Sequence, residues 1–341
     1  MKDHPLNRAL VLLAACLFGG VAMSQNYPDR VVRIVNTFPA GGSGDAVLRV
    51  VFEKVGAALG QPFIAETRTG AGGSIGTEYA AKAAPDGYTL LLGTASTFGT
   101  NSATIPKLPY DPIRDFTPVV MIATTPYLLL AHPSVPVNSV AELVAYAKAN
   151  PNKLNYGSFG SGSSNQLAYE LLKQVTGVEM VHVPYKGGAP LITALLAGEV
   201  QSSLDVYATS ISHVRSGRFK LLGVASAKRF SLLPQTPTLT EQGYPVEGGT
   251  FFAVLGPAKM PRNVTDTLNR EVNRVLQMPD VRERLAELPD ASVQVCVTSP
   301  PYWGLRDYGI AGQIGREPSA DEHIGLLVDV FRDVHRVLAS G

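Results

Sequence analysis

The stretch VVRIVNTFPAGGSGDAVLRVVFEKVGAAL, residues 31–59, decides the fold expected for this chain. Its β-branched start suits a buried strand, and the glycine-rich turn PAGGSG, residues 39–44, ends that strand. Apolar residues then recur at three- and four-residue spacing, which predicts a helix with Ser43 and Asp45 as capping types at its start. A glycine loop at a helix N-terminus can hold a carboxylate or phosphate, because free backbone N–H groups converge there. The same glycines can equally do no more than shape a tight turn.

The chain continues as alternating strand-like and helix-like segments, which predicts an α/β fold with a mostly parallel sheet. Two further loops follow this pattern: a glycine loop at 68–73 ahead of a helix, and a run of hydroxyls at 93–97 after a strand. In open α/β sheets, ligands lie beyond the carboxyl ends of the strands. The three loops therefore point to one crevice.

A second cycle of strands and helices is expected from about residue 123, with a strand at 127–131 and a helix at 140–149 capped by Ser139. The loop GSFGSGSS, residues 157–164, lies between a strand and an amphipathic helix and offers four serine hydroxyls at a helix start. It is the strongest anion-binding loop in the sequence. A flexible linker is the alternative interpretation.

Three polar residues further along have two interpretations each. Lys186 can pair with a ligand carboxylate and Asp205 can accept from a ligand hydroxyl or amine, although each is also typical of a solvated loop. His182 stands between valines in a predicted strand, which favours a core or edge residue over a catalyst. Strand-like segments follow at 200–204 and 219–224, with an extended, proline-bearing run at 233–237.

Residues 1–24 have the pattern of a signal peptide, with two basic residues ahead of an apolar run and cleavage expected after Ser24. The segment LAAC, which ends at Cys16, also resembles a lipoprotein cleavage box and gives a lipid-anchored form as the second interpretation. We expect a periplasmic protein in either case.

Charge and cysteine content exclude several classes of function. The chain has 29 basic and 28 acidic side chains, and loss of residues 1–24 would leave no net formal charge. No general field therefore attracts nucleic acid, and an anion must be held by local geometry. After cleavage Cys296 is the one remaining thiol, so no intrachain disulfide is expected, and no spacing of cysteine or histidine predicts a metal site.

Seven motifs in order resemble one family, the substrate-binding receptors of tripartite tricarboxylate transporters, also called Bug-type receptors. These motifs are PAGGSGD (39–45), TRTGAGGSIG (67–76), AAPDGYTLLLGT (83–94), KLPYDPIRDFTPV (107–119), YGSFGSGSSNQLAYELLK (156–173), VPYKGGAPLITALLAGEV (183–200) and LPQTPTLTEQGYP (233–245). The resemblance covers the chain to about Val281.

The resemblance implies a type II periplasmic-binding-protein fold, two α/β lobes joined by two crossovers. Lobe 1 would comprise residues 25–124 and 227–287, and lobe 2 residues 125–226, with crossovers near 123–127 and 223–228. Such receptors bind a small carboxylate between the lobes and deliver it to membrane permease subunits. The resemblance therefore implies a receptor without catalysis, cofactor or metal, expected to be a monomer.

The family's ligand-binding positions can be carried over to this sequence residue by residue. One side of the site would be lined by Pro39, Gly41, Gly42, Asp45, Thr94 and Ser96. The other side would be lined by Ser158, Gly160, Ser161, Gly162, Ser163, Ser164, Tyr185, Lys186, Gly187 and Asp205. Gly44 departs from the family, which often has a residue with a side-chain contact there, so the ligand class can differ.

The C-terminal tail, residues 288–341, departs from the family altogether. It contains TSPPYW, residues 298–303, and resembles the region around the catalytic motif of amino-group DNA methyltransferases. We find no glycine-rich loop for S-adenosylmethionine, so a DNA methyltransferase is the disfavoured alternative function. A junction between unrelated coding regions near residues 283–290 explains the atypical tail. A serine hydrolase is excluded, because the serine loop has no G-x-S-x-G elbow.

Overall fold

The computed structural model describes residues 27–287 of the 341-residue chain. The predicted signal peptide, Cys16, Cys296 and the TSPPYW segment lie outside the described residues. Within 27–287, no helix has both the length and the apolar character needed to cross a membrane.

The first βα unit forms as the sequence predicts. Strand β1 (Val32–Asn36) runs into the glycine loop, and helix α2 (Ser43–Leu59) follows. The helix start differs from the prediction, because its N-cap is Gly42 and no side chain caps it. Asp45 instead accepts a hydrogen bond from the Gly41 amide, which stabilises the loop and leaves the helix N-terminus open.

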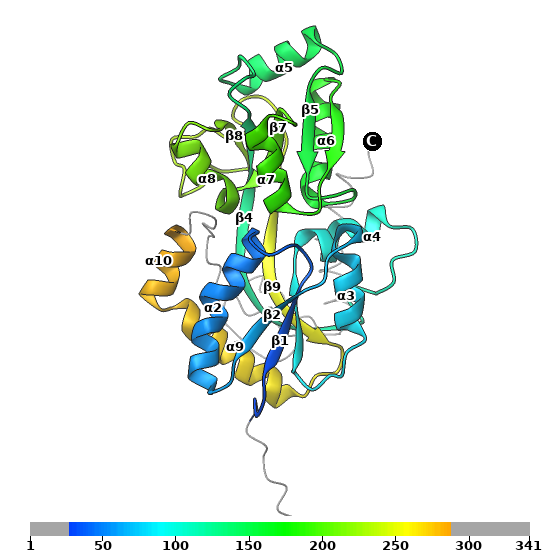
Figure 1. The fold of residues 1–341 in the computed structure, drawn as a ribbon, viewed down its shortest axis with the longest axis vertical. Coiled ribbons are helices and arrows are strands. Elements are labelled where there is room, and N and C mark those ends of the chain that lie inside the picture. Colours follow the sequence, from blue (N-terminus) through cyan, green and yellow to red (C-terminus); the bar gives the residue numbers. More distant parts are fainter. Residues whose placement is uncertain (1–26, 288–341) are drawn as a thin grey trace, which may run out of the picture.

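Lobe 1 is a five-stranded part of the sheet covered on both faces (Figure 1). Its strands lie in the order β2-β1-β3-β9-β4. One face packs on α2 and α9, and the other on α3 (Figure 1). The elements of this lobe are β2 (Phe63–Thr67), η1 (Ala71–Gly73), α3 (Ser74–Ala81), β3 (Thr89–Gly93), η2 (Ser96–Thr100), α4 (Asn101–Thr104), β9 (Gly249–Pro257), α9 (Arg262–Leu276) and α10 (Pro279–Glu287).

Alternation along the strands of lobe 1 divides its core into two layers. Ile34 faces the layer shared with α2 and α9, whereas its neighbour Val35 faces the layer beneath α3. Leu90 and Leu91 of β3 divide in the same way. All four are at most 1% exposed, so the sheet is buried on both faces, as parallel α/β sheets require.

Lobe 2 is a further part of the sheet with helices packed on it, and Figure 1 shows it above lobe 1. Helices α7 and α8 cover one face of its sheet, and α5 and α6 pack on the other core layer. Its elements are α5 (Val140–Ala149), β5 (Asn155–Ser158), α6 (Ser164–Thr176), β6 (Val181–Pro184), α7 (Gly188–Ala197), β7 (Ser202–Val206), α8 (Tyr207–Arg215) and β8 (Lys220–Ala225). Helix α5 has the predicted bounds, and Ser139 caps it by accepting from the Glu142 amide at 3.1 Å.

The two lobes share one long strand, β4 (Phe116–Ala131), which the sequence did not predict as a unit. Its first part pairs with β9 as far as Pro126, and its second part, from Tyr127, pairs with β7 and β8. All these pairings are antiparallel, as is that between β3 and β9, so the expected mostly parallel sheet is instead mixed.

The return connection to lobe 1 leaves β8 at Ala225 and enters β9 at Gly249. The intervening residues 226–248 lie beside β8, where Val224 forms a bridge with Thr238. The run 233–237 forms turns rather than the extended segment predicted from its prolines. The lobe boundaries at 124/125 and 226/227 remain a proposal, and the change of strand partners lies close to the first of them.

Candidate functional site

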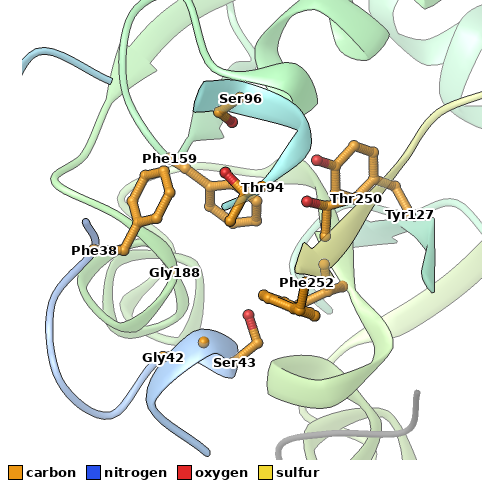
Figure 2. Close-up of a pocket in the computed structure, with 12 residues that line it drawn as sticks. Phe38, Gly42, Ser43, Thr94, Ser96, Tyr127, Phe159, Gly188, Thr250 and Phe252 are labelled. Carbon is orange, nitrogen blue, oxygen red and sulfur yellow. The ribbon is translucent and has the colours of Figure 1, made fainter. Parts of the chain in front are cut away.

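A small cavity lies between the two lobes, where β4 and β9 pass from one to the other (Figure 2). Its volume is about 40 Å³, far below that of most small-molecule sites, so the two lobes lie close together in this structure. The residues that line it are Phe38, Gly42, Ser43, Gly44, Thr94, Ser96, Tyr127, Phe159, Gly188, Val206, Thr250 and Phe252.

Three helices begin at this cavity. Gly42 is the N-cap of α2, Gly188 is the first residue of α7, and Val206 is the N-cap of α8. None of the three has a side chain that caps its first turn. Uncapped first-turn N–H groups carry the positive end of the helix dipole, so the backbone favours an anion here.

The side chains around the cavity are uncharged. The twelve described residues that line it include no lysine, arginine, histidine, aspartate or glutamate. Figure 2 shows the hydroxyls of Ser43 and Thr250 directed into the space between the lobes. Amides and hydroxyls bind a carboxylate through charge-assisted hydrogen bonds, and no competing side-chain anion lines the cavity.

Packing behind the cavity leaves no room for a side chain at position 44. A Cβ atom there would lie 2.9 Å from Cδ2 of Leu92 and 3.3 Å from Oδ1 of Asn36. The missing side chain would therefore point into the lobe 1 core, so the glycine brings the first turn of α2 close to β1. Asn36 is 1% exposed, and its Nδ2 has no hydrogen-bond partner among the described residues.

A chain of hydroxyls crosses the cleft beside the cavity. The Tyr127 hydroxyl lies 2.5 Å from Oγ of Ser164, which lies 3.1 Å from Oγ of Ser96. Burial raises the pKa of Tyr127 above its ordinary value, so the phenol stays protonated and keeps its donor. Thr94 lines the same cavity and forms a hydrogen bond with Thr97 of η2.

Aromatic rings form the apolar wall of the cavity. Phe38 and Phe159 lie on one side of the space and Phe252 lies on the other (Figure 2). They come from three separate elements: the loop after β1, the loop after β5, and strand β9. A ligand with a hydrocarbon body could bury it against these rings.

Of the residues predicted on the lobe 1 side, Gly42, Thr94 and Ser96 line the cavity. The other three lie close by in the same loop and helix. Gly41 donates its amide to Asp45, and Asp45 also forms an ion pair with Arg49 at 3.1 Å. Pro39 lies against Gly187 of the opposite lobe. A ligand contact by these three residues remains a prediction.

The predicted serine loop enters α6, but its hydroxyls are bound largely within the protein. Ser158 Oγ lies 2.6 Å from Nε2 of His182, and Ser163 Oγ donates to the Gly160 carbonyl at 2.6 Å. The loop residues Ser158, Gly160, Ser161, Gly162, Ser163 and Ser164 lie outside the cavity lining, although Phe159 belongs to it. Their direct contact with a ligand stays untested.

The last four predicted residues lie on lobe 2. The Tyr185 hydroxyl donates to Glu199 at 3.4 Å, and Lys186 is exposed. Gly187 is the N-cap of α7, one residue before the cavity. Asp205 is fully buried at the end of β7 and accepts hydrogen bonds from the first turn of α8. A role for these residues in binding remains a prediction.

Most of the residues that line the cavity were not predicted from the sequence. Tyr127, Val206, Thr250 and Phe252 come from strands that meet only in the folded sheet. Thr250 and Phe252 lie two residues apart in GTFFAVLG, residues 249–256, whose continuous apolar run was a usable signal for a buried strand. No group of histidine, cysteine, aspartate and glutamate within residues 27–287 could hold a metal ion.

Comparison with known proteins gives a consistent assignment. Residues 47–296 match the profile of the tripartite tricarboxylate transporter family receptor. Protein BugT of Bordetella pertussis is 34% identical over 278 residues, which cover 81% of this chain and 85% of BugT. Among solved structures, R. palustris Rpa4515 with adipate is 37% identical with a TM-score of 0.75, covering 78% of this chain and 89% of that one.

A second solved structure, MatC (Rpa3494) from Rhodopseudomonas palustris with bound malate, is 34% identical with a TM-score of 0.74 and covers 78% of this chain and 90% of its own. A separate similarity is short: 65 residues, 19% of this chain, are 48% identical to the type II methyltransferase M.SfiI of Streptomyces fimbriatus. They cover 15% of that enzyme, in keeping with a methyltransferase fragment at the C-terminus.

Proposed function

Because the chain belongs to the receptor family of tripartite tricarboxylate transporters, we propose that it binds a small carboxylate in the cavity between its lobes and delivers it to the permease subunits of such a transporter. The receptor acts in the periplasm, as a monomer and without catalysis. The observation that carries the binding site is the meeting of three uncapped helix N-termini at a cavity without charged side chains.

The carboxylate binds at the start of α2. Gly42 leaves room for a ligand oxygen to approach the backbone N–H groups, and Ser43 adds a hydroxyl at the same place. Hydrogen bonds from neutral donors to a carboxylate are strong when water is excluded. No arginine is then needed to hold the charge.

Aliphatic dicarboxylates are the first ligands to test. Related structures hold adipate and malate, which combine two carboxylates with a short hydrocarbon chain. In this chain the start of α2 comes from lobe 1 and the starts of α7 and α8 come from lobe 2. One carboxylate would bind at each side, and the hydrocarbon would contact Phe159 and Phe252.

Calorimetric titration with malate and adipate tests the proposal. Thr94→Val and Thr250→Val each remove one hydroxyl from the cavity and preserve the shape of the side chain. We expect each to weaken binding by about 1.5 to 3 kcal/mol, the usual effect of losing a hydrogen bond to a charged group.

Thr193→Val is the matched control, because Thr193 is exposed on α7 and bonds its own helix. Its affinity should equal that of the wild type. Equal losses in all three variants, or no loss in any, would place the ligand elsewhere.

The similarity to a methyltransferase favours a second function, but the match spans too little of that enzyme to carry it. Methyl transfer requires a methyl donor held about 3 to 3.5 Å from the accepting amino group. The sequence has no recognisable glycine-rich loop to hold S-adenosylmethionine as that donor. We therefore propose that the tail contributes no catalysis.

A further inference from the structure

The two lobes touch directly through polar contacts outside the cavity. The carbonyl of Gly162, in the serine loop of lobe 2, accepts a hydrogen bond from Oγ1 of Thr100 at 2.9 Å. Oγ1 of Thr104 lies 3.5 Å from the same carbonyl, although its shorter hydrogen bond, at 2.9 Å, goes to the Thr100 carbonyl. Both threonines lie in η2 and α4 of lobe 1 and are absent from the cavity lining. These contacts join one lobe directly to the other.

A second contact lies nearer the cavity. The backbone N–H of Ser164, at the start of α6, donates to Oγ of Ser96 at 3.2 Å, and the two hydroxyls lie 3.1 Å apart. Tyr127 also holds Ser164 in place through a hydrogen bond between the two hydroxyls, which lie 2.5 Å apart. Tyr127 is also the residue at which β4 changes its strand partners from one lobe to the other.

The serine loop is shaped for this approach. Gly162 has a φ of +79°, and a Cβ atom there would lie 2.7 Å from Oγ1 of Thr104. Gly72 of lobe 1 approaches the same loop, since a Cβ atom on it would lie 3.4 Å from the Ser161 carbonyl. Glycine at both positions lets the two backbones come together.

We propose that the serine loop is an interlobe latch that stabilises the closed receptor. The latch consists of the hydrogen bond from Thr100 to the carbonyl of Gly162, with Thr104 beside it, and of the hydrogen bond from the N–H of Ser164 to Ser96. The Thr100 hydroxyl and the N-terminus of α6 act on the opposite lobe, and Ser96 also lines the cavity. Closure is thus favoured by contacts that the protein makes with itself, and the ligand adds to an equilibrium that already includes the closed form.

The latch is coupled to binding through Ser96, which belongs both to the latch and to the cavity lining. A ligand that contacts Ser96 also holds the latch in place. The apparent affinity then depends on the fraction of receptor in the closed form. This coupling rests on the proposed function, whereas the latch itself does not.

The test removes the latch contacts to the Gly162 carbonyl, which lie outside the cavity, with the double variant Thr100→Val, Thr104→Val. Spin labels on cysteines placed at the exposed positions Lys107 of lobe 1 and Gln174 of lobe 2 report the distance between lobes, with Cys16 and Cys296 replaced by serine. Without ligand, the double variant should shift toward longer distances. The conservative variant Thr100→Ser, Thr104→Ser keeps both hydroxyls and should restore the wild-type distribution.

Binding provides the second readout. The double variant should bind malate and adipate about three- to tenfold more weakly, with their ratio unchanged, because closure and not ligand contact is lost. If the wild-type receptor binds no carboxylate, the proposed function is refuted. The spin-label distances between the lobes still test the latch in that case. An unchanged distance distribution, or a serine variant that opens as far as the valine variant, refutes the latch.

Discussion

Gly187 offers the sharpest test of how closely the lobes approach. Its φ of +116° belongs to a backbone conformation that L side chains rarely adopt. A Cβ atom at this position would lie 2.7 Å from Cδ of Pro39, a separation that real Cβ atoms do not show. Gly187→Ala therefore perturbs two things at once: the backbone of lobe 2 and the contact with lobe 1.

The two effects differ in what they change. The strained backbone lowers the stability of the fold by about 1 to 3 kcal/mol, whether the receptor is open or closed. The contact with Pro39 disfavours the closed form alone, because the ring of Pro39 is stiff and the lobes must separate. A cost of about 1.4 kcal/mol in closure would weaken ligand binding about tenfold.

Gly177→Ala isolates the first effect. Gly177 ends α6 with a φ of +67°, and a Cβ atom there meets nothing within 4 Å. We expect thermal unfolding to show a lower Tm for both variants, and calorimetry with malate or adipate to show weaker binding for Gly187→Ala alone. If Gly187→Ala binds as tightly as Gly177→Ala, the reasoning about the interlobe contact is wrong.

Three further predictions concern single groups. Burial lowers the pKa of His182 from its ordinary value of 6.5, so on acidification the unfolded chain takes up a proton before the folded chain does. The stability of the fold should therefore fall as pH drops below about 6.5. Melting curves should show a smaller fall in Tm for His182→Gln, and an equal fall would exclude His182 as the cause. Asp205 accepts hydrogen bonds from Thr209 and Ser210, both at 2.6 Å. Denaturant unfolding should therefore show Asp205→Ala destabilised by about 2 to 4 kcal/mol and Asp205→Asn by less. A larger loss for Asp205→Asn than for Asp205→Ala would contradict the role of these hydrogen bonds. The full chain should neither bind S-adenosylmethionine in calorimetry nor methylate DNA, and either activity would show that the tail is functional.

Local patterns were enough to predict the individual βα units. The run from Val31 to Leu59 contains its own strand, turn and helix, and α5 has the bounds that its periodicity and Ser139 predict. The recognised family motifs were confirmed by the family match and by similar structures. These features depend on residues close together in sequence, so sequence alone can show them.

The helix N-cap shows where local reasoning failed. Ser43 and Asp45 have good capping side chains, yet the structure uses Gly42 and leaves the first turn of α2 open. Asp45 bonds the loop instead. Propensity predicts a capped helix, because it takes no account of the contact with the Gly41 amide that engages Asp45 instead.

The sequence by itself determined the family, the α/β class and the glycine loop that reaches the cavity, since each depends on residues close together in the chain. The tertiary structure decided that one strand, β4, serves both lobes and that β9 returns antiparallel beside it. It also brought Tyr127 and Thr250 to the cavity beside Ser96. Strand pairing over such sequence separations depends on the burial of whole sheet faces, so no local pattern specifies it.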